Sequence, residues 1–272
     1  RKEGRKEGRK EGRKEGRKEG RKEGRKEGWN NFPILTVLTE LSEREDTRLI
    51  YNEHAIALIY DDNGVTRLYL DLSSLEAAPA LRELLGQICA RPIIIDCVGS
   101  AERVEEVSLA LCTAGFAPYA HLRRLRNTNI QYHPEADAVI QPALPEDCEP
   151  IFSLLCETFD PYVSHLPSRE KLLRLINDQL VYRIVENGEI AAVQCLERTG
   201  TRGLYIYQTL VAPPYRGRGL GTLVIPYIPG CCAGSCSFFT VWVIDGNERS
   251  VRVLQRSGAV FDGLEDTVLI FR

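Results

Sequence analysis

A basic, glycine-rich hexapeptide, Arg216-Gly217-Arg218-Gly219-Leu220-Gly221, carries the strongest chemical signal in the sequence. It stands between an apolar stretch that ends in Leu210-Val211 and the start of an expected helix. The first turn of a helix leaves backbone N–H groups unpaired and carries a partial positive charge, so anions bind there readily. Glycines let the backbone approach a phosphate closely, and arginines add charge. The segment therefore predicts a pyrophosphate-binding loop, and the alternative interpretation is a tight basic turn.

Two other phosphate-binding motifs fit this segment poorly. The dinucleotide fingerprint Gly-x-Gly-x-x-Gly needs a spacing that Gly217, Gly219 and Gly221 do not have. It also belongs to an early strand-loop-helix unit with an acidic residue placed for a ribose. The P-loop needs a following Gly-Lys-Ser/Thr, which is not present here. Both classes of nucleotide-binding protein are therefore disfavoured.

An alternation of helices and strands is expected to position this loop. The patterning predicts helices over 146–156 and 171–180, a hairpin around Asn187-Gly188, strands over 204–211 and 238–244, a helix over 248–257 and a last strand through 268–271. Ser168 is the expected N-cap of the second helix. Pro226 and Pro229 predict that the helix after the loop is short or kinked. This order is typical of an α/β fold.

The earlier half of the chain repeats part of this plan. It predicts a hairpin over 55–72, helices over 75–89 and 101–114, and a buried strand over 92–98. Residues 95–103 resemble residues 243–249, which indicates an internal duplication. Where the later half has its Arg/Gly loop, the earlier half has Ser73 to Pro79, which contains no glycine. We therefore expect no phosphate binding of this kind in the earlier half.

Composition bounds the remaining possibilities. The first 28 residues are seven copies of Arg-Lys-Glu-Gly, which we interpret as an artificial or disordered low-complexity tail. The tail holds 14 of the 35 basic and 7 of the 38 acidic residues, so the other 244 residues carry 21 and 31, a net charge of about −10. This balance disfavours nucleic acid and anionic membranes as partners and is compatible with a cationic amine substrate. We expect domains at 29–130 and 142–272, joined by a linker at 131–141.

Cysteines and apolar runs add two expectations. The nine cysteines are scattered through apolar segments, so most are expected to be reduced core residues. Cys231, Cys232 and Cys236 lie close together, but no matching histidine or second cysteine pair stands near them, so we expect no metal site. No apolar segment approaches the roughly 18 residues needed to span a bilayer, and no secretory leader is visible, so a cytoplasmic location is expected.

At the Arg/Gly loop the chain resembles the GNAT superfamily of N-acetyltransferases. The family motif Arg/Gln-x-x-Gly-x-Gly/Ala fits Arg216, Gly219 and Gly221. A second resemblance is Asn247-Glu248-Arg249-Ser250, after a strand and before a helix that leads to Gly258. The resemblance covers about residues 140–272, and the ordered pair of motifs is more specific than either motif alone. It implies an α/β fold with a mixed sheet, built as two GNAT-like domains in tandem, of which the N-terminal one is degenerate.

The resemblance also implies a cofactor and its ligands. Acetyl-CoA, or another acyl-CoA, would lie in a cleft where the fourth and fifth strands of the domain splay apart. Backbone groups of Leu210 and Val211 would hold the pantetheine, with the Val211 N–H as oxyanion donor, and Asn247 and Ser250 would contact the pantetheine arm. The implied pyrophosphate ligands are Arg216, Gly217, Arg218, Gly219, Leu220, Gly221 and Thr222. The chemistry would be direct attack of a neutral amine on the thioester carbonyl.

For the acceptor, the family places its pocket at the loop between the first two helices and on the fourth strand. The residues implied to bind substrate are Phe159, Tyr162, Tyr205, Tyr207 and Gln208. Glu157, Asp160 and His165 are titratable candidates for proton acceptance or amine recognition, and a plain loop or capping role is the alternative for each. The acceptor is expected to be a small-molecule amine or a peptide, and its identity is left open.

One departure from the family leaves the activity open. Many members have a tyrosine in the helix after the asparagine motif, as general acid for the departing thiolate, and here Leu254 stands in its place. The alternative to an active enzyme is therefore a catalytically weak or inactive CoA-binding regulatory module. The duplication allows either a monomer that forms a pseudo-dimer within one chain or a homodimer.

Overall fold

The computed structural model describes residues 29–31, 47–89 and 92–272. The tail predicted at 1–28 lies outside the described residues. Twelve described strands form one mixed sheet in the order β2-β3-β4-β5-β12-β6-β11-β10-β9-β8-β7, with β1 paired to β4. The β4–β5 and β10–β11 pairs are parallel and the other pairs are antiparallel. The predicted α/β fold with a mixed sheet is confirmed.

The earlier half of the chain supplies six strands and two helices. The strands are β1 (Trp29–Asn30), β2 (Arg48–Tyr51), β3 (Ala55–Asp62), β4 (Val65–Leu72), β5 (Ile93–Ser100) and β6 (Ala117–Asn127). Helix α4 (Ala101–Thr113) begins at Ser100, whose hydroxyl accepts a hydrogen bond from the Arg103 N–H. The single helix predicted over 75–89 is wrong. A 3₁₀ helix η1 (Leu75–Ala80) contains Pro79 and is followed by a short α3 (Leu81–Gly86), because proline cannot donate its backbone hydrogen bond within a longer α-helix.

The later half begins with two helices and a set of antiparallel strands. The helical elements are η2 (Pro134–Ala138), η3 (Pro145–Asp147), α5 (Cys148–Thr158), α6 (Arg169–Asn177), η4 (Pro213–Tyr215), α7 (Leu220–Val224), α8 (Gly230–Ala233) and α9 (Glu248–Arg256). The strands are β7 (Gln141–Pro142), β8 (Val181–Glu186), β9 (Glu189–Thr199), β10 (Gly203–Val211), β11 (Phe238–Ile244) and β12 (Val260–Phe271). Ser168 caps α6 as predicted, by accepting from the Lys171 N–H. None of the helices described is long and apolar enough to cross a membrane.

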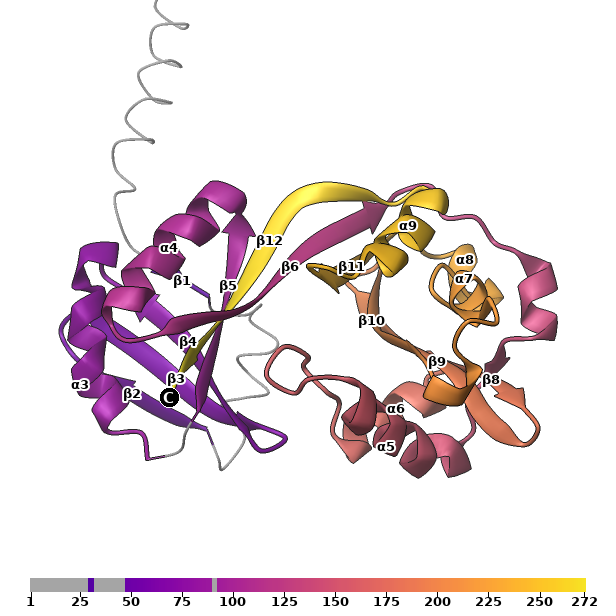
Figure 1. The fold of residues 1–272 in the computed structure, drawn as a ribbon, viewed down its shortest axis with the longest axis horizontal. Helices are drawn as coiled ribbons and strands as arrows, with labels where there is room; N and C mark the ends of the chain where they lie inside the picture. The colour runs from indigo at the N-terminus through magenta and orange to yellow at the C-terminus, as the bar shows by residue number, and fades with distance from the viewer. Residues whose placement is uncertain (1–28, 32–46, 90–91) are drawn as a thin grey trace, which may run out of the picture.

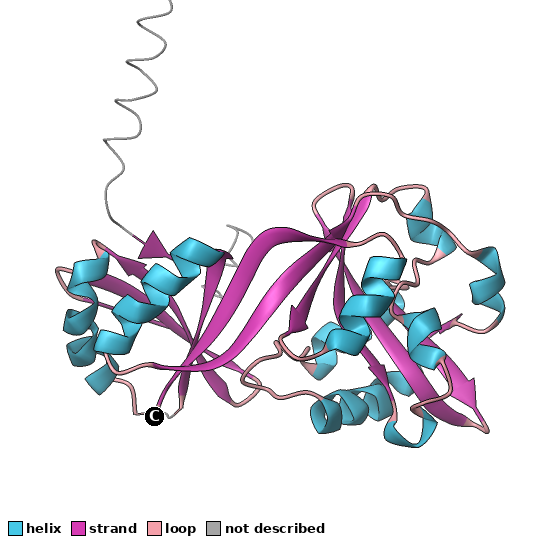
Figure 2. Cartoon of the chain, turned by 45° about the horizontal axis from the view of Figure 1, so that its top comes forward, coloured by secondary structure: helices cyan, strands magenta, loops and turns pink. Residues whose placement is uncertain are grey.

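The two halves exchange strands at the centre of the sheet. In the predicted repeat, β5 and β6 of the earlier half correspond to β11 and β12 of the later half. In the sheet these four strands lie in the order β5-β12-β6-β11. Strand β12 therefore pairs with β5 of the earlier half, and β6 pairs with β11 of the later half. Figure 1 shows β6 and β12 as long ribbons that run from one half of the molecule to the other, and Figure 2 shows helices gathered around each end. The division into domains at 29–130 and 142–272 stays a prediction, and the pairing of β12 with β5 crosses it.

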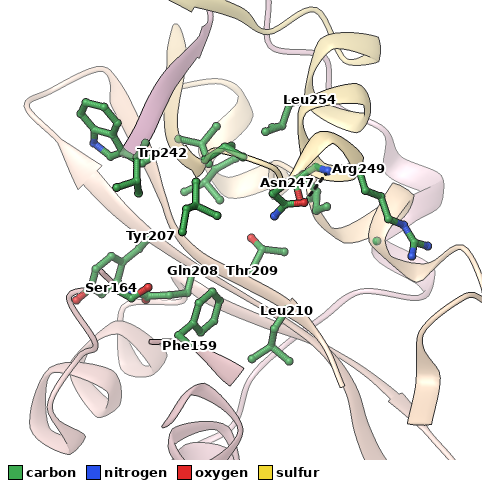
Figure 3. Close-up of a pocket in the computed structure, with 18 of the residues that line it drawn as sticks. Phe159, Ser164, Tyr207, Gln208, Thr209, Leu210, Trp242, Asn247, Arg249 and Leu254 are labelled. Carbon is green, nitrogen blue, oxygen red and sulfur yellow. Dashed lines mark hydrogen bonds between the residues drawn. The ribbon is translucent and has the colours of Figure 1, made fainter. Parts of the chain in front are cut away.

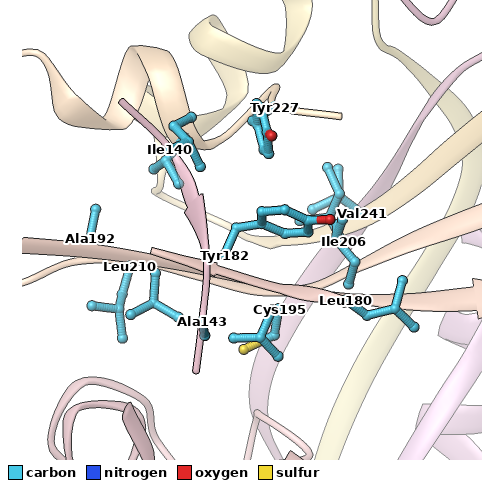
Figure 4. Close-up of a cluster of buried hydrophobic side chains, with 14 of the residues drawn as sticks. Ile140, Ala143, Leu180, Tyr182, Ala192, Cys195, Ile206, Leu210, Tyr227 and Val241 are labelled. Carbon is cyan, nitrogen blue, oxygen red and sulfur yellow. The ribbon is translucent and has the colours of Figure 1, made fainter. Parts of the chain in front are cut away.

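Separate apolar cores lie at the two ends of this sheet. The larger one fills the C-terminal half, where Tyr182 packs edge-on against Tyr227 with 5.3 Å between ring centroids, close to Leu180, Ile206 and Val241 (Figure 4). The second core lies between α3, α4 and the N-terminal strands. A smaller cluster around Ile94 and Val268 is packed against Tyr162 and Val163 from the later half. This last cluster joins the two halves on the sheet face opposite α4.

Candidate functional site

A cleft opens in the sheet where β10 and β11 part. The two parallel strands pair only from Gly203 to Tyr205 and from Phe238 to Thr240, and β10 has an irregularity in its pairing with β9 between Ile206 and Gln208. Beyond this point a cavity of about 1170 Å³ lies between the strands. The backbone Ala212 N–H donates to Ala191 O of β9 over 2.9 Å, so by strand alternation the N–H groups of Thr209 and Val211 point the other way, into the cleft.

The Arg/Gly loop forms one end of this cavity. Gly217 and Gly219 have φ angles of +82° and +86°, a conformation that disfavours any side chain. The α7 helix begins directly after Gly219 and ends at Val224, as its downstream prolines predicted. Arg216 lines the cavity and donates from Nε to Val211 O over 3.0 Å. Arg218 is turned toward Glu186, with 3.1 Å between Nη1 and Oε2, and is not part of the cavity lining.

Helix α9 forms the facing wall. The Asn247 side chain caps the helix by accepting a hydrogen bond from the Ser250 N–H over 3.2 Å, and both residues line the cavity. Arg249 and Arg252 also line the cavity and add positive charge near the loop. Neither was predicted from the sequence as a cofactor ligand, although residues three apart lie side by side on one face of a helix. Leu254 lines the cavity and is 1% exposed. Figure 3 shows Asn247, Arg249 and Leu254 on one side of the cleft.

Most of the residues expected to bind the acceptor lie together on the opposite side. Phe159, Tyr205, Tyr207 and Gln208 line the cavity, and Figure 3 shows Phe159, Tyr207 and Gln208 grouped near Ser164. Tyr207 donates its hydroxyl hydrogen to His165 O, and the Gln208 amide donates to the same oxygen over 3.0 Å. These two bonds tie the loop between α5 and α6 to β10.

Two further candidates lie away from the cavity. Tyr162 packs edge-on against Tyr119, with 5.7 Å between ring centroids, and Glu157 is exposed on α5. Neither residue is part of the cavity lining. Asp160 does line it, and its carboxylate accepts hydrogen bonds from the Tyr119 hydroxyl over 2.5 Å and from the Tyr162 N–H over 2.9 Å.

His165 lines the cavity within a charged cluster at the junction of the halves. Its Nδ1 lies 3.1 Å from Asp62 Oδ2 and its Nε2 lies 3.4 Å from Asp96 Oδ2. Burial disfavours the charged imidazole, but the two aspartates outweigh it and raise the pKa of His165 to about 9. The side chain is therefore protonated at neutral pH and has no free position for another proton. We do not assign it the role of proton acceptor.

None of the nine cysteines lines this cavity. Cys231 Sγ and Cys232 Sγ are 3.9 Å apart, and burial raises the pKa of the Cys232 thiol to about 12. Among the residues that the structure describes, no group of three or more His, Cys, Asp or Glu is placed to hold a metal ion.

The chain is similar to proteins of one known family. Residues 148–259 match the family model described as the Acetyltransferase (GNAT) family. None of the curated proteins compared with the chain matches it. Among solved structures, a GCN5-related N-acetyltransferase from Sphaerobacter thermophilus has a TM-score of 0.61 and 15% identity, over 88% of this chain and 85% of that chain.

Two other solved structures are also similar. A GCN5-related N-acetyltransferase from Kribbella flavida has a TM-score of 0.57 and 14% identity, over 86% of this chain and 92% of that chain. A tandem GNAT protein from the clavulanic acid biosynthesis pathway has a TM-score of 0.55 and 13% identity, over 83% of each chain. At such low identities the similarity shows a shared fold.

Proposed function

We propose that the protein is an acyl-CoA-dependent N-acyltransferase that transfers an acetyl group to an amine, in keeping with the match of residues 148–259 to the GNAT acetyltransferase family model. One observation carries the proposal: the diverging strands, the Arg/Gly loop and the Asn247 cap all line a single cavity. An elongated ligand with an anionic end would fit along it. The acceptor is a small-molecule amine or a peptide.

The residues present fit the cofactor. Backbone N–H groups at the start of α7, with Arg216, would bind the pyrophosphate, and Arg249 and Arg252 on α9 add charge nearby. The edge of β10 beyond Tyr205 no longer pairs with β11, so its cleft-facing groups are available to the pantetheine amides. Asn247 and Ser250 would contact the same arm from the other wall.

The chemistry needs an oxyanion donor and a route for protons. The Val211 N–H, which points into the cleft, is our candidate donor to the oxyanion that forms when an amine attacks the thioester carbonyl. Leu254 cannot donate a proton to the leaving thiolate. Burial raises the pKa of Tyr205 and Tyr207 well above neutral, so both keep their protons. A thiol with an ordinary pKa of about 8.5 leaves without an acid, which permits turnover.

Isothermal titration with acetyl-CoA tests the cofactor part of this proposal, and a folded sample that shows no heat of binding refutes it. Release of free CoA thiol in the presence of an amine panel tests the catalytic part. The second candidate, a CoA-binding regulatory module, is favoured by Leu254. Binding of acetyl-CoA without transfer to any amine would support that module over the enzyme.

A further inference from the structure

The cavity continues beyond the family domain onto strands of the N-terminal half. Tyr69 on β4 and Asp96 and Val98 on β5 line it, together with Asp266 on β12. The exchanged strand β12 brings Asp266 beside β5, where it lies opposite Val98. Asp96 is two residues from Val98, so Asp96 and Asp266 are diagonal neighbours on the same face of the sheet. The acceptor side of the cavity is therefore built by both halves of the chain.

This cavity gathers polar atoms that lack hydrogen-bond partners. Among the described residues, four buried side-chain oxygens without a partner belong to residues that line it: Asp96 Oδ1, Gln208 Oε1, Thr209 Oγ1 and Asp266 Oδ1. Gln208 is only 5% exposed, and its amide nitrogen is already used by His165 O. A buried oxygen without a donor is costly. Four such acceptors around one cavity favour a ligand that brings N–H donors.

The two carboxyl groups differ in their partners. Asp96 Oδ2 lies 3.2 Å from Arg67 Nη1 and 3.4 Å from His165 Nε2, so its charge is balanced. Burial raises the pKa of Asp96, but His165 and Arg67 outweigh this and lower it. No ion pair joins Asp266 to any cation among the described residues.

Asp266 has the protonation behaviour of a base that works near neutral pH. Burial, followed by the charge of Asp96, raises the pKa of Asp266 to about 8, although His165 and Arg67 partly offset this. Tyr205 lines the same cavity at the point where the cleft opens. Burial raises the pKa of Tyr205 most, and the negative charges of Glu197 and Asp266 raise it further. With His165 and Arg67 positive and Asp62 and Asp96 negative, the cluster is neutral until Asp266 ionises. Ionised Asp266 leaves one negative charge for a cationic ligand.

We propose that Asp266 receives the ammonium group of the acceptor and takes its proton, with Asp96, Gln208 and Thr209 as further hydrogen-bond acceptors. This inference rests on the proposed N-acyltransferase function. One N–H proton passes to the Asp266 carboxylate, and the neutral amine attacks the thioester carbonyl to form the C–N bond. The C–S bond breaks, the thiolate takes the second nitrogen proton to give free CoA thiol, and Asp266 returns its proton to solvent. The acceptor is accordingly an amine that is protonated in solution and carries at least two N–H protons in that form.

The Asp266→Asn variant keeps the size of the side chain and removes the base, and Glu265→Gln is the matched control. Glu265 is adjacent on β12, pairs with His121 over 3.1 Å and does not line the cavity. We expect Asp266→Asn to lower kcat/KM at pH 7.5 about 100-fold or more for the best amine of a panel, a usual loss for a missing general base. Glu265→Gln and the wild type should agree within about twofold. Loss below threefold in Asp266→Asn overturns the inference.

The pH profile separates a base from a merely structural residue. In the wild type, kcat/KM should rise with pH and level off above about 8, where Asp266 is ionised. In Asp266→Asn it should keep rising toward the pKa of the amine itself, about 10.4 for a lysine-like amine. The same profile in both proteins would refute the proposed role.

A binding experiment needs no turnover, so it tests the role of Asp266 even if no amine in the panel reacts. n-Butylammonium and neutral n-butanol are titrated into the acetyl-CoA-bound wild type and Asp266→Asn at pH 7.5, in buffers of different ionisation enthalpy. We expect the ammonium to bind at least tenfold tighter than butanol in the wild type, with proton release, and to lose both properties in Asp266→Asn. Equal affinity for the two probes in the wild type overturns the inference while the cofactor proposal stands. Failure of the wild type to bind acetyl-CoA refutes both proposals.

Discussion

Replacing Arg67 with methionine should test how strongly the charged cluster holds the two halves together. The Arg67 side chain is 1% exposed and has three partners: Asp62 Oδ2 at 2.7 Å from Nε, Asp96 Oδ2 at 3.2 Å from Nη1, and Pro161 O at 2.9 Å from Nη2. Asp62 and Asp96 lie on N-terminal strands, whereas Pro161 lies in the loop after α5. Methionine would fill much of the same space but leave both buried carboxylates without this cation.

The magnitude follows from the burial. Removing one partner of a buried ion pair costs about 3–5 kcal/mol. Because His165 still contacts both carboxylates, we expect a loss at the lower end of this range, about 3 kcal/mol. In a chain of this size that corresponds to a fall in Tm of roughly 6–12 °C. The matched control is Arg169→Met, because Arg169 makes two hydrogen bonds to Glu149 but is 57% exposed, and solvent screens such pairs.

Urea unfolding at pH 7, followed by far-ultraviolet circular dichroism, gives the free energy of unfolding for both variants. The loss of stability in Arg67→Met relative to the wild type should shrink when the measurement is repeated well below pH 4, at about pH 2.5. His165 and Arg67 lower the pKa of Asp62 and Asp96 against the effect of burial, so the stability these carboxylates contribute is present above pH 4 and is lost as pH falls. Equal losses of stability in Arg67→Met and Arg169→Met would refute the reasoning.

Three further outcomes are expected. Gly219→Ala forces alanine into φ +86° at the phosphate loop, so it should lose about 1 kcal/mol of stability and weaken acetyl-CoA binding about tenfold by calorimetry. Gly188→Ala, at φ +81° in a hairpin turn, should lose similar stability without the binding defect, and equal Kd values for the two variants would contradict this. Asn247→Ala and Ser100→Ala each remove a helix cap and should each lose about 1 kcal/mol, but only the first should weaken acetyl-CoA binding. The pKa of His165 is raised to about 9, so the stability that protonated His165 contributes is complete below pH 6.5 and is lost as pH rises through 9. The free energy of unfolding of the wild type should therefore fall between pH 7 and 10, and His165→Asn should reduce that fall. Identical pH dependence in both proteins would argue against this role of His165.

Local features of the fold were predictable from the sequence. The Asn63-Gly64 and Asn187-Gly188 turns have positive φ at both positions, as their hairpins require, and the strand predicted over 238–244 coincides with β11. Strand β6 was missed because its arginines read as a polar segment. In the structure Arg123, Arg124 and Arg126 lie over Phe261, Trp242 and Phe238, at 4.5, 5.7 and 4.3 Å from the ring centroids. Aromatic faces and aliphatic stems explain how such residues occupy a central strand.

The two sides of the candidate site also differ in how far the sequence predicts them. Its cofactor side depends on short motifs around Arg216 and Asn247, whose chemistry is local to one turn of helix, and the structure brings both to one cavity. The acceptor side that we propose depends on Asp96 and Asp266, which become neighbours only because β12 inserts beside β5. Neither residue belongs to the two motifs that carry the family resemblance. Patterning along one chain reports the faces of individual elements, whereas this pairing is decided by the topology of the whole sheet.

The strand exchange also determines when the N-terminal half can finish folding during synthesis. Ile93 pairs with Phe271, so the side of β5 that faces β12 stays unpaired until residues up to Phe271 have left the ribosome. Until then β5 and β6 expose edges that belong against β12, and such edges invite pairing with other nascent chains. The N-terminal half therefore completes its folding only once β12 has been made, together with the later half.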